Sequence, residues 1–222
     1  ALALFGTILV YYASEHLLGV SSEALRWSQL YRVAVGLDPG AIKVAFIFAL
    51  IGYGTKAGIA PMHTWLPDAH AEAPTPVSAM LSANMLTVAV YAILRFKAVT
   101  DRTVGPEFAG NLIVGLALLS LAVSAIFFLV QRDYKRLFAY SSIEHIGIAL
   151  LGFGIGGLGI FAGAWHLMNH AFAKSTAFYG AGLVFLRHDH KMLDRVTGLL
   201  NQMPVAGTAI LVASVALAGM PP

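Results

Sequence analysis

Long apolar runs, separated by short polar stretches, make up most of this chain. Seven runs approach the roughly 20 residues that an α-helix needs to cross a hydrocarbon core about 30 Å thick. They lie at about 1–18, 41–60, 76–95, 109–130, 137–154, 157–186 and 204–222. Backbone groups in lipid must be satisfied within their own segment, so the pattern predicts an all-α, polytopic bundle of transmembrane helices. The alternating ten-residue segments of an outer-membrane barrel are absent from the sequence.

Composition supports the same class of protein. Of the 222 residues, 58% are hydrophobic and 11% are charged, whereas soluble domains carry roughly 25% charged residues. The net charge of +3 is small and spread between polar stretches, which argues against nucleic-acid binding. The absence of cysteine excludes disulfides, cysteine-ligated iron–sulfur clusters and thiol catalysis from this chain. Because the sequence opens and closes within apolar runs, we expect one transmembrane domain, 1–222, that is a fragment of a larger fold.

The polar stretches predict the loops between the helices. They fall at about 19–40, 61–75, 96–108, 131–136 and 187–203, with a Gly-rich tight link at 152–159. Successive loops would face opposite sides of the membrane. The loops on one side carry five lysine and arginine residues, and those on the other side carry six. The positive-inside rule therefore does not orient this chain.

The second apolar run has the composition of an interrupted helix. It contains Gly52, Gly54 and Gly58, carries Lys56 and ends at Pro61. Dense glycine and proline weaken a helix, and in transporters such discontinuous helices line ion or substrate sites near the membrane midplane. Lys56 is either such a site or a lysine that extends its ammonium group to the membrane interface.

A Pro-rich segment, "MHTWLPDAHAEAPTP", follows the interruption. It fits the second, interfacial half of the same broken helix. Two imidazoles and two carboxylates make this half a candidate access path for ions: His63, Asp68, His70 and Glu72. The run "RHDHK" at 187–191 resembles a metal motif, but its polar surroundings favour a solvated charge run.

Three basic residues recur at four-residue intervals in the sixth apolar run. On a helix, His166, His170 and Lys174 would span about 80° of one face and climb about 12 Å, which makes a column. A metal site is one interpretation, but the column lacks a carboxylate and ends in a cation. Haem ligation is a second, and it needs a histidine on a facing helix, for which His145 is available.

We favour a third interpretation of the column, a proton relay. Histidine titrates near neutrality, and desolvation lowers the pKa of lysine into the same range. The alternative is that these residues only hold helices together by hydrogen bonds. Since ionisable groups inside membranes are expensive and usually functional, the relay is the better hypothesis.

The stretch "QRDYKRLFAYSSIEHIG" adds further candidates to the relay. Its first cations, Lys135 and Arg136, have the placement of interfacial anchors. Glu144 and His145 lie two to three turns deeper, where a carboxylate and an imidazole fit the same relay. A purely structural pair between Glu144 and Lys135 is the competing interpretation.

Three motifs together resemble a known family. "TKAGIAPMHTWLPDAHAEAPTPVSAML", "QRDYKRLFAYSSIEHIG" and "HLMNHAFAKS" are similar to the antiporter-like membrane subunits of respiratory complex I and of energy-converting hydrogenases. The resemblance implies an ion-translocating fold of roughly fourteen helices with two inverted five-helix repeats. It also implies that Lys56 is the central lysine of the first broken helix, and that Lys135, His166, His170 and Lys174 belong to a polar axis.

One departure narrows the resemblance. Complex I subunits often carry lysine or histidine in the next helix, where "SAMLSANMLTVAVYAILRF" offers only Ser82, Asn84 and Thr87. This uncharged version is more similar to the hydrogenase-4 component F type of subunit. The glutamate partner that the family provides for Lys56 is expected before residue 1, and the charged residue of the second broken helix after residue 222.

The sequence therefore predicts a multi-pass subunit of the inner cell membrane that moves protons or sodium ions within a redox-driven hydrogenase or NADH dehydrogenase-like complex. We expect no cofactor or metal in this chain, with redox chemistry left to a peripheral arm and to other membrane subunits. The alternatives are a stand-alone cation/proton antiporter and a haem-binding electron-transfer subunit.

Overall fold

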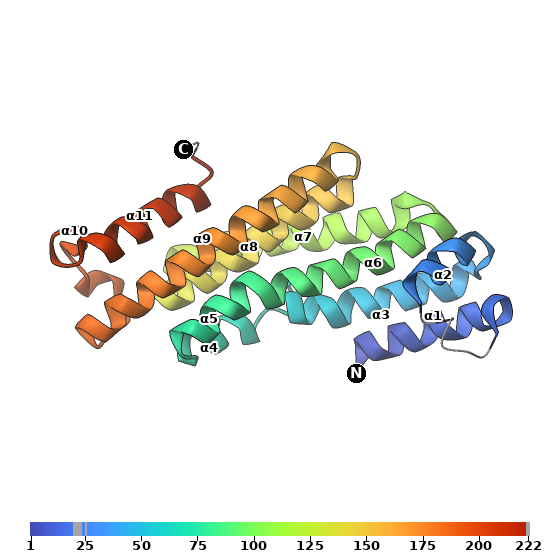
Figure 1. Cartoon of the computed structure of the whole chain (residues 1–222), viewed down its shortest axis with the longest axis horizontal. Helices are drawn as coiled ribbons and strands as arrows, with labels where there is room; N and C mark the ends of the chain where they lie inside the picture. The colour runs from blue at the N-terminus through green and yellow to red at the C-terminus, as the bar shows by residue number, and fades with distance from the viewer. Residues whose placement is uncertain (20–23, 25, 221–222) are drawn as a thin grey trace.

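A computed structural model describes residues 1–19, 24 and 26–220 as a bundle of helices (Figure 1). No strand occurs in these residues. The helices, in chain order, are α1 (Leu2–Leu18), α2 (Trp27–Val33), η2 (Ala34–Gly36), α3 (Pro39–Ala57), α4 (Trp65–Glu72), α5 (Thr75–Met80), η3 (Leu81–Met85), α6 (Leu86–Val104), α7 (Pro106–Val130), α8 (Tyr134–Ile155), α9 (Leu158–His188), η4 (Leu193–Arg195), α10 (Leu199–Gln202) and α11 (Pro204–Leu217). The predicted all-α bundle is confirmed, and each of the seven predicted spans contains a helix. Residues 221–222 of the last span lie outside the described residues.

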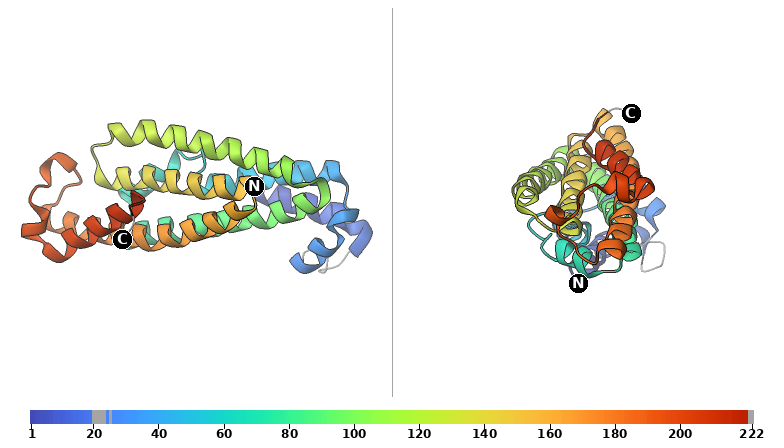
Figure 2. Two further views of the ribbon diagram at one scale, coloured as in Figure 1. Left: turned by 90° about the horizontal axis from the view of Figure 1, so that it is seen from above. Right: turned by 90° about the vertical axis from the view of Figure 1, so that its left-hand side faces the viewer.

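The long helices run side by side along the longest axis of the molecule (Figure 1). Figure 2 shows α8 between α7 and α9, and α8 packs closely against both. The main core joins buried residues of α3, α4 and α6–α9. Four helical stretches have the length and apolarity to cross a membrane: 39–57, 75–104, 106–130 and 134–155. Many of their large apolar side chains face outwards, as expected of helices that contact lipid.

Small residues set the distance between α8 and α9. A side chain at Gly163 would bring its Cβ to 2.7 Å from the carbonyl oxygen of Ala149, and one at Gly152 would reach 2.6 Å from that of Gly159. Only glycine permits so close an approach, which is how membrane helices commonly pack. The contact lies one helical turn from His145 and His166, so it brings their backbones together.

The predicted break in the second apolar run is confirmed. Helix α3 ends at Ala57, and Gly58 adopts the left-handed conformation with φ 72°. Two bonds satisfy groups near the break: the Ala60 N–H donates to Ser120 Oγ at 2.9 Å, and Trp65 Nε1 donates to the Thr55 carbonyl at 2.7 Å. Neighbouring side chains thus replace the missing helical bonds, as irregular backbone inside a membrane protein requires.

The loop predicted at 96–108 is wrong. Helix α6 continues to Val104, and Gly105, with φ 101°, forms the turn into α7. The charges in this stretch do not end the helix because Lys97 and Asp101 lie one turn apart and bond to each other at 2.5 Å. Lys97 is buried by its neighbours. The polar composition marked the end of the apolar span but not the end of the helix.

Candidate functional site

Helix α9 carries the predicted column of bases, and the column faces the protein interior. Lys174 is 0% exposed and His170 is 1% exposed, while His166 is partly buried. The helix is continuous through all three residues, so the four-residue spacing places them on one face. That face packs against α8. The sequence argument for a column on one side of the helix is confirmed.

His145 on α8 joins this column. Its Nδ1 lies 2.9 Å from Nε2 of His166, and its ring centre lies 5.5 Å from that of His170. One nitrogen of the His145–His166 pair must donate and the other accept, so one proton lies between the two rings in this hydrogen bond. His145, His166 and His170 thus form a cluster of three imidazoles. The direct hydrogen bond between His145 and His166 offers a route for a proton from one helix to the other.

The ammonium of Lys174 is held by the backbone of α8. Its Nζ donates to the Phe138 carbonyl at 2.9 Å, and the same oxygen accepts from Ser142 Oγ at 2.9 Å. Within the described residues, no carboxylate forms an ion pair with Lys174. A buried cation without a counter-ion is expensive, so a lysine at this position calls for a functional explanation.

A polar link leads from Lys174 to the start of α6. Ser142 Oγ lies 2.9 Å from Ser82 Oγ, with either atom able to donate. Ser82 belongs to η3, a π-helical turn that comes directly before α6. Such turns occur frequently at functional sites. Sequence reasoning noted Ser82 only as an uncharged substitute and did not identify Ser142. The one available signal was a serine among buried apolar residues on each helix.

The four residues predicted to line an access path divide into two pairs. Asp68 and Glu72 are exposed, and they pair with Arg136 at 2.6 Å and Lys191 at 3.7 Å respectively. His63 and His70 are buried. The predicted path would therefore have carboxylates at its outer surface and imidazoles inside.

His70 belongs to the interior of the site. It is 0% exposed, its ring stacks on Phe178 of α9 at 4.8 Å, and neither ring nitrogen has a hydrogen-bond partner in the described residues. Phe178 follows Lys174 by one helical turn. His70 thus continues the line of buried bases from α9 onto α4, beyond the column that the sequence predicted.

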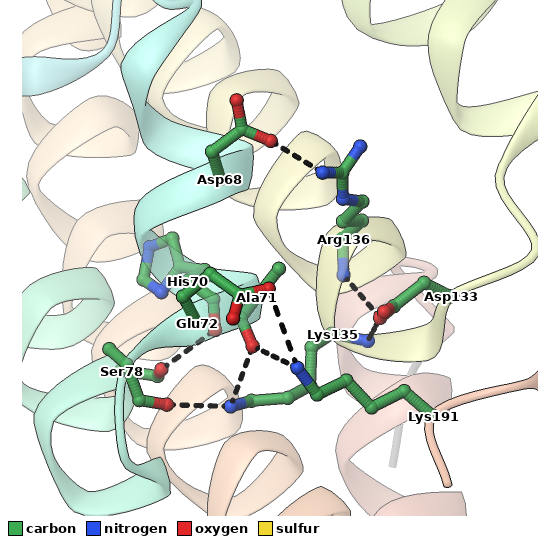
Figure 3. A network of polar contacts seen from close by, with 10 residues as sticks. Asp68, His70, Ala71, Glu72, Ser78, Asp133, Lys135, Arg136 and Lys191 are labelled. Carbon is green, nitrogen blue, oxygen red and sulfur yellow. Dashed lines mark hydrogen bonds and ion pairs between the residues drawn. The ribbon is translucent and has the colours of Figure 1, made fainter.

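Lys135 lies at the carboxyl end of α4 (Figure 3). Its side chain is buried, and Nζ donates to the carbonyls of Ala73 at 2.7 Å and Ala71 at 3.4 Å. Lys191 Nζ donates to the same Ala71 oxygen at 2.7 Å. Both cations therefore satisfy free carbonyls at the negative end of the helix dipole. The structural pair between Lys135 and Glu144 does not form.

The segment 187–191 is not only a solvated charge run. Asp133 and Met192 form an isolated antiparallel bridge, and the Tyr134 N–H donates to the Lys191 carbonyl at 3.1 Å. This bridge brings the segment back to the start of α8. Asp133 caps that helix by accepting from the N–H groups of Lys135 and Arg136. Lys191 is thereby positioned against α4, so the sequence interpretation is corrected for this residue.

Glu144 and Lys56 lie outside the buried line of bases. Glu144 is partly exposed and lines a cavity of about 430 Å³ with Ser141 and His145, between α7, α8 and α11. Lys56, near the end of α3, is exposed and makes no hydrogen bond or ion pair with the described residues. The structure therefore brings His145 to the column but does not bring Lys56 there.

The described residues gather no set of metal-ligating side chains at the column. His145 Nδ1 and His166 Nε2 lie 2.9 Å apart, a hydrogen-bond distance, so these two nitrogens engage each other. Across the described part of the chain, no three side chains of histidine, aspartate or glutamate gather closely enough to hold a metal.

Comparison with known proteins places the sequence in one family. Residues 2–222 match the family described as NADH:quinone oxidoreductase/Mrp antiporter, transmembrane. The chain is 46% identical to a hydrogenase-4 component F homolog of Methylacidiphilum infernorum, covering 100% of this chain and 47% of that protein. It is 32% identical to hydrogenase-4 component B of Escherichia coli, covering 98% and 34%.

Solved structures show the same likeness. A chain of the membrane-bound sulfane sulfur reductase, an archaeal respiratory membrane complex, superposes with a TM-score of 0.89 at 28% identity, covering 99% of this chain and 44% of the other. The present chain spans less than half the length of these relatives. The resemblance inferred from the motifs is confirmed, including its hydrogenase-4 side. The chain belongs to the NADH:quinone oxidoreductase/Mrp antiporter family of membrane proteins.

Proposed function

We propose that this chain forms part of a proton-translocating subunit in the inner cell membrane, within a redox-driven complex of the hydrogenase or NADH:quinone oxidoreductase type. The observation that carries the proposal is Lys174: fully buried, without a carboxylate partner in the described residues, and in line with buried imidazoles. Ionisable groups at such positions mark ion pathways in membrane proteins. The relatives are named as components of hydrogenase-4, and the family is described as transmembrane.

The proposed pathway runs along the line of bases between α4, α8 and α9. Protons would pass between His166 and His145 through their direct hydrogen bond, and between His170 and Lys174 through water, since successive column residues rise about 6 Å along the helix. His63 and His70 would connect this line to the surface near Asp68 and Glu72. Lys135 and Glu144 flank the line. From the family resemblance, Lys56 would be the switchable site of the first broken helix.

The chemistry of the line favours protons over sodium ions. Its buried members, the histidines and Lys174, are nitrogen bases that accept protons, whereas hard cations prefer several oxygen ligands. The oxygens beside Lys174 are already engaged: the Phe138 carbonyl accepts from Lys174 and from Ser142, and Ser142 Oγ also bonds to Ser82 Oγ. Redox cofactors would reside in partner subunits, including a peripheral arm. The relatives' names support such partners, which separates this proposal from a stand-alone antiporter.

Substitution of Lys174 tests the proposal. Lysine at a desolvated site can lose its proton, whereas arginine stays charged. In proteoliposomes holding the whole complex, we expect Lys174→Arg to assemble but lose proton uptake per redox turnover by about tenfold or more, a factor typical of removing a proton-transfer group. His170→Gln should give an intermediate loss, because water can bridge the gap.

Lys43→Arg is the matched control, because Lys43 is an exposed lysine on α3. It should pump at the wild-type ratio. If Lys174→Arg also pumps at that ratio, the relay is rejected and the column only holds helices together. Uptake that requires sodium would replace the proton with sodium as the transported ion.

A further inference from the structure

A second site lies at the opposite end of the bundle from the network in Figure 3, between α1, α2, α3 and α6. It is a cavity of about 310 Å³ whose walls include Val10, Leu30, Ile42 and Phe46. Sites for small organic ligands begin at roughly 300 Å³ and are mostly apolar with a few polar groups. None of the proposed relay residues lines this cavity, so its role is independent of ion translocation.

Of the described residues that line the cavity, Arg95 is the one cation. Its guanidinium carbon lies 5.0 Å from the ring centre of Trp27 and 4.8 Å from that of Tyr91, and Nε donates to Tyr91 Oη at 2.5 Å. No carboxylate in the described residues pairs with it. Nε is used in the bond to Tyr91, and the two aromatic rings fix the orientation of the guanidinium plane. The two terminal amino groups therefore remain for two-point hydrogen bonding to an anion such as phosphate.

The position of Arg95 fits the level of lipid headgroups. Arg95 lies at the end of the predicted apolar span 76–95. Helix α6 continues beyond it for nine residues, to Val104, which is about 13 Å along the helix axis. Trp27 on α2 lies beside it, and tryptophan and tyrosine concentrate at membrane interfaces. Tyr91 is 52% exposed, so the cavity opens on the outer surface of the described bundle. A second pair repeats the arrangement further along α6, where Arg102 lies 4.6 Å from the ring centre of Tyr31.

Arg95 differs from Lys135 and Lys191, at the other end of the bundle, in what surrounds its charge. Lys135 and Lys191 donate to helix carbonyls, and Lys191 also lies near Glu72. Among the described residues, the partners of Arg95 are the aromatic side chains of Trp27 and Tyr91. An added anion would therefore complete the charge balance at Arg95, whereas at the lysines that balance already exists.

We propose that this cavity binds an anionic phospholipid, with the phosphate on Arg95 and part of one acyl chain against the apolar walls. Both halves of the ligand follow from the site: the free edge of the guanidinium selects an anion, and the apolar walls at membrane depth select a hydrocarbon chain. A soluble phosphate would use only the first half. A neutral lipid would use only the second.

Lipid binding to the purified, delipidated complex tests this proposal. Labelled phosphatidylglycerol in mixed micelles is titrated onto the immobilised complex, with phosphatidylcholine and glycerol phosphate as competitors. Arg95→Gln should weaken the saturable phosphatidylglycerol site by about fivefold to tenfold, the effect of one cation on an anionic lipid. Ala92→Phe should weaken it comparably by filling the cavity without changing charge, because Ala92 lines the wall. Arg32→Gln, an exposed arginine on α2 outside the cavity, should bind like the wild type.

Three results would overturn the proposal. Unchanged phosphatidylglycerol binding in both Arg95→Gln and Ala92→Phe would mean that no lipid occupies the cavity. Equal competition by glycerol phosphate would indicate a site for a free anion. Loss of a neighbouring subunit from the Arg95→Gln complex, with lipid retained, would make the cavity a protein interface. Should Arg95→Gln fail to assemble, Arg95→Lys supplies the same comparison, and it is expected to bind more weakly than arginine because lysine cannot hold phosphate at two points.

Discussion

Lys174 and Lys56 both stand in apolar helices, but the structure treats them in opposite ways. Lys174 lies within the unbroken helix α9, is 0% exposed and bonds to the backbone of α8. Lys56 lies two residues before the break between α3 and α4 and is exposed. A charge in lipid can be accommodated by burial among polar groups or by irregular backbone that gives access to water. The chain uses the first device at Lys174, and the second is available at Lys56.

The comparison separates two roles that one residue type can serve. A lysine buried between packed helices can exchange a proton only with the groups beside it, directly or through an intervening water. A lysine beside a helix break can respond to groups that lie elsewhere. In the proposed function, Lys174 would be an internal step of the relay and Lys56 the site that other parts of the protein control.

The largest difference between the two lysines should appear on substitution by methionine. We expect Lys174→Met and Lys56→Met both to lose proton uptake per turnover, by about tenfold or more. Their stabilities should diverge. Removing the buried amine at 174, which bonds to the Phe138 carbonyl but has no carboxylate partner in the described residues, should leave the complex as stable as the wild type or stabilise it by up to about 1–2 kcal/mol, because burying a charge without a counter-ion is costly. At the exposed position 56 the change should stay within about 0.5 kcal/mol.

Thermal unfolding of the detergent-solubilised complex measures this divergence, with Lys43→Met as the exposed control. Marked destabilisation by Lys174→Met would mean that the lysine holds α8 and α9 together through the Phe138 carbonyl. Full pumping by Lys56→Met would remove that residue from the pathway and leave its side chain as an interfacial anchor.

Water access sharpens the same comparison. We expect cysteine at Thr55, which is exposed beside the break, to react with a polar thiol reagent at least about tenfold faster than cysteine at Ala177, which is 0% exposed on α9; such ratios reflect the access that governs thiol chemistry. Gly58 is a poor probe, since a Cβ there would lie 2.7 Å from Leu66 Cδ2. The chain contains no native cysteine. Similar protection of both positions in the active complex would argue against water reaching the break.

The smallest expected effect concerns the far end of the broken helix. Lys191→Gln removes a cation from the carboxyl end of α4 and should destabilise the complex by about 0.5–1 kcal/mol, the usual worth of a charge at a helix end. Arg136→Gln, which removes only the exposed pair with Asp68, should cost less, near the low end of about 0.2–1 kcal/mol. Thermal unfolding of both variants compares them. An equal or larger effect from Arg136→Gln would mean that Lys191 does not stabilise the end of α4.

The helices themselves were predictable from the one-dimensional pattern. Each of the seven apolar runs contains a helix, four stretches have the length and apolarity of membrane spans, and glycine density with Pro61 located the break after Ala57. Four-residue spacing was enough to place His166, His170 and Lys174 on one face. These features depend on local backbone geometry and on the cost of exposing polar groups to lipid, and both are determined by residues that are close together in the sequence. The same reasoning failed at 96–108 because a pair of opposite charges one turn apart satisfies itself within a helix.

The partners of the site residues depended on the packing of helices distant in sequence. The His145–His166 bond joins residues 21 apart, Lys135 reaches a carbonyl 62 residues away, and Lys191 reaches one 120 residues away. Each contact depends on how far two helices are rotated and shifted against each other. Hydrophobic periodicity predicts which face of a helix is buried but not its axial position relative to a neighbouring helix. Close contacts such as Gly163 against Ala149 set that axial position, so the contacts between the predicted bases could be identified only from the structure.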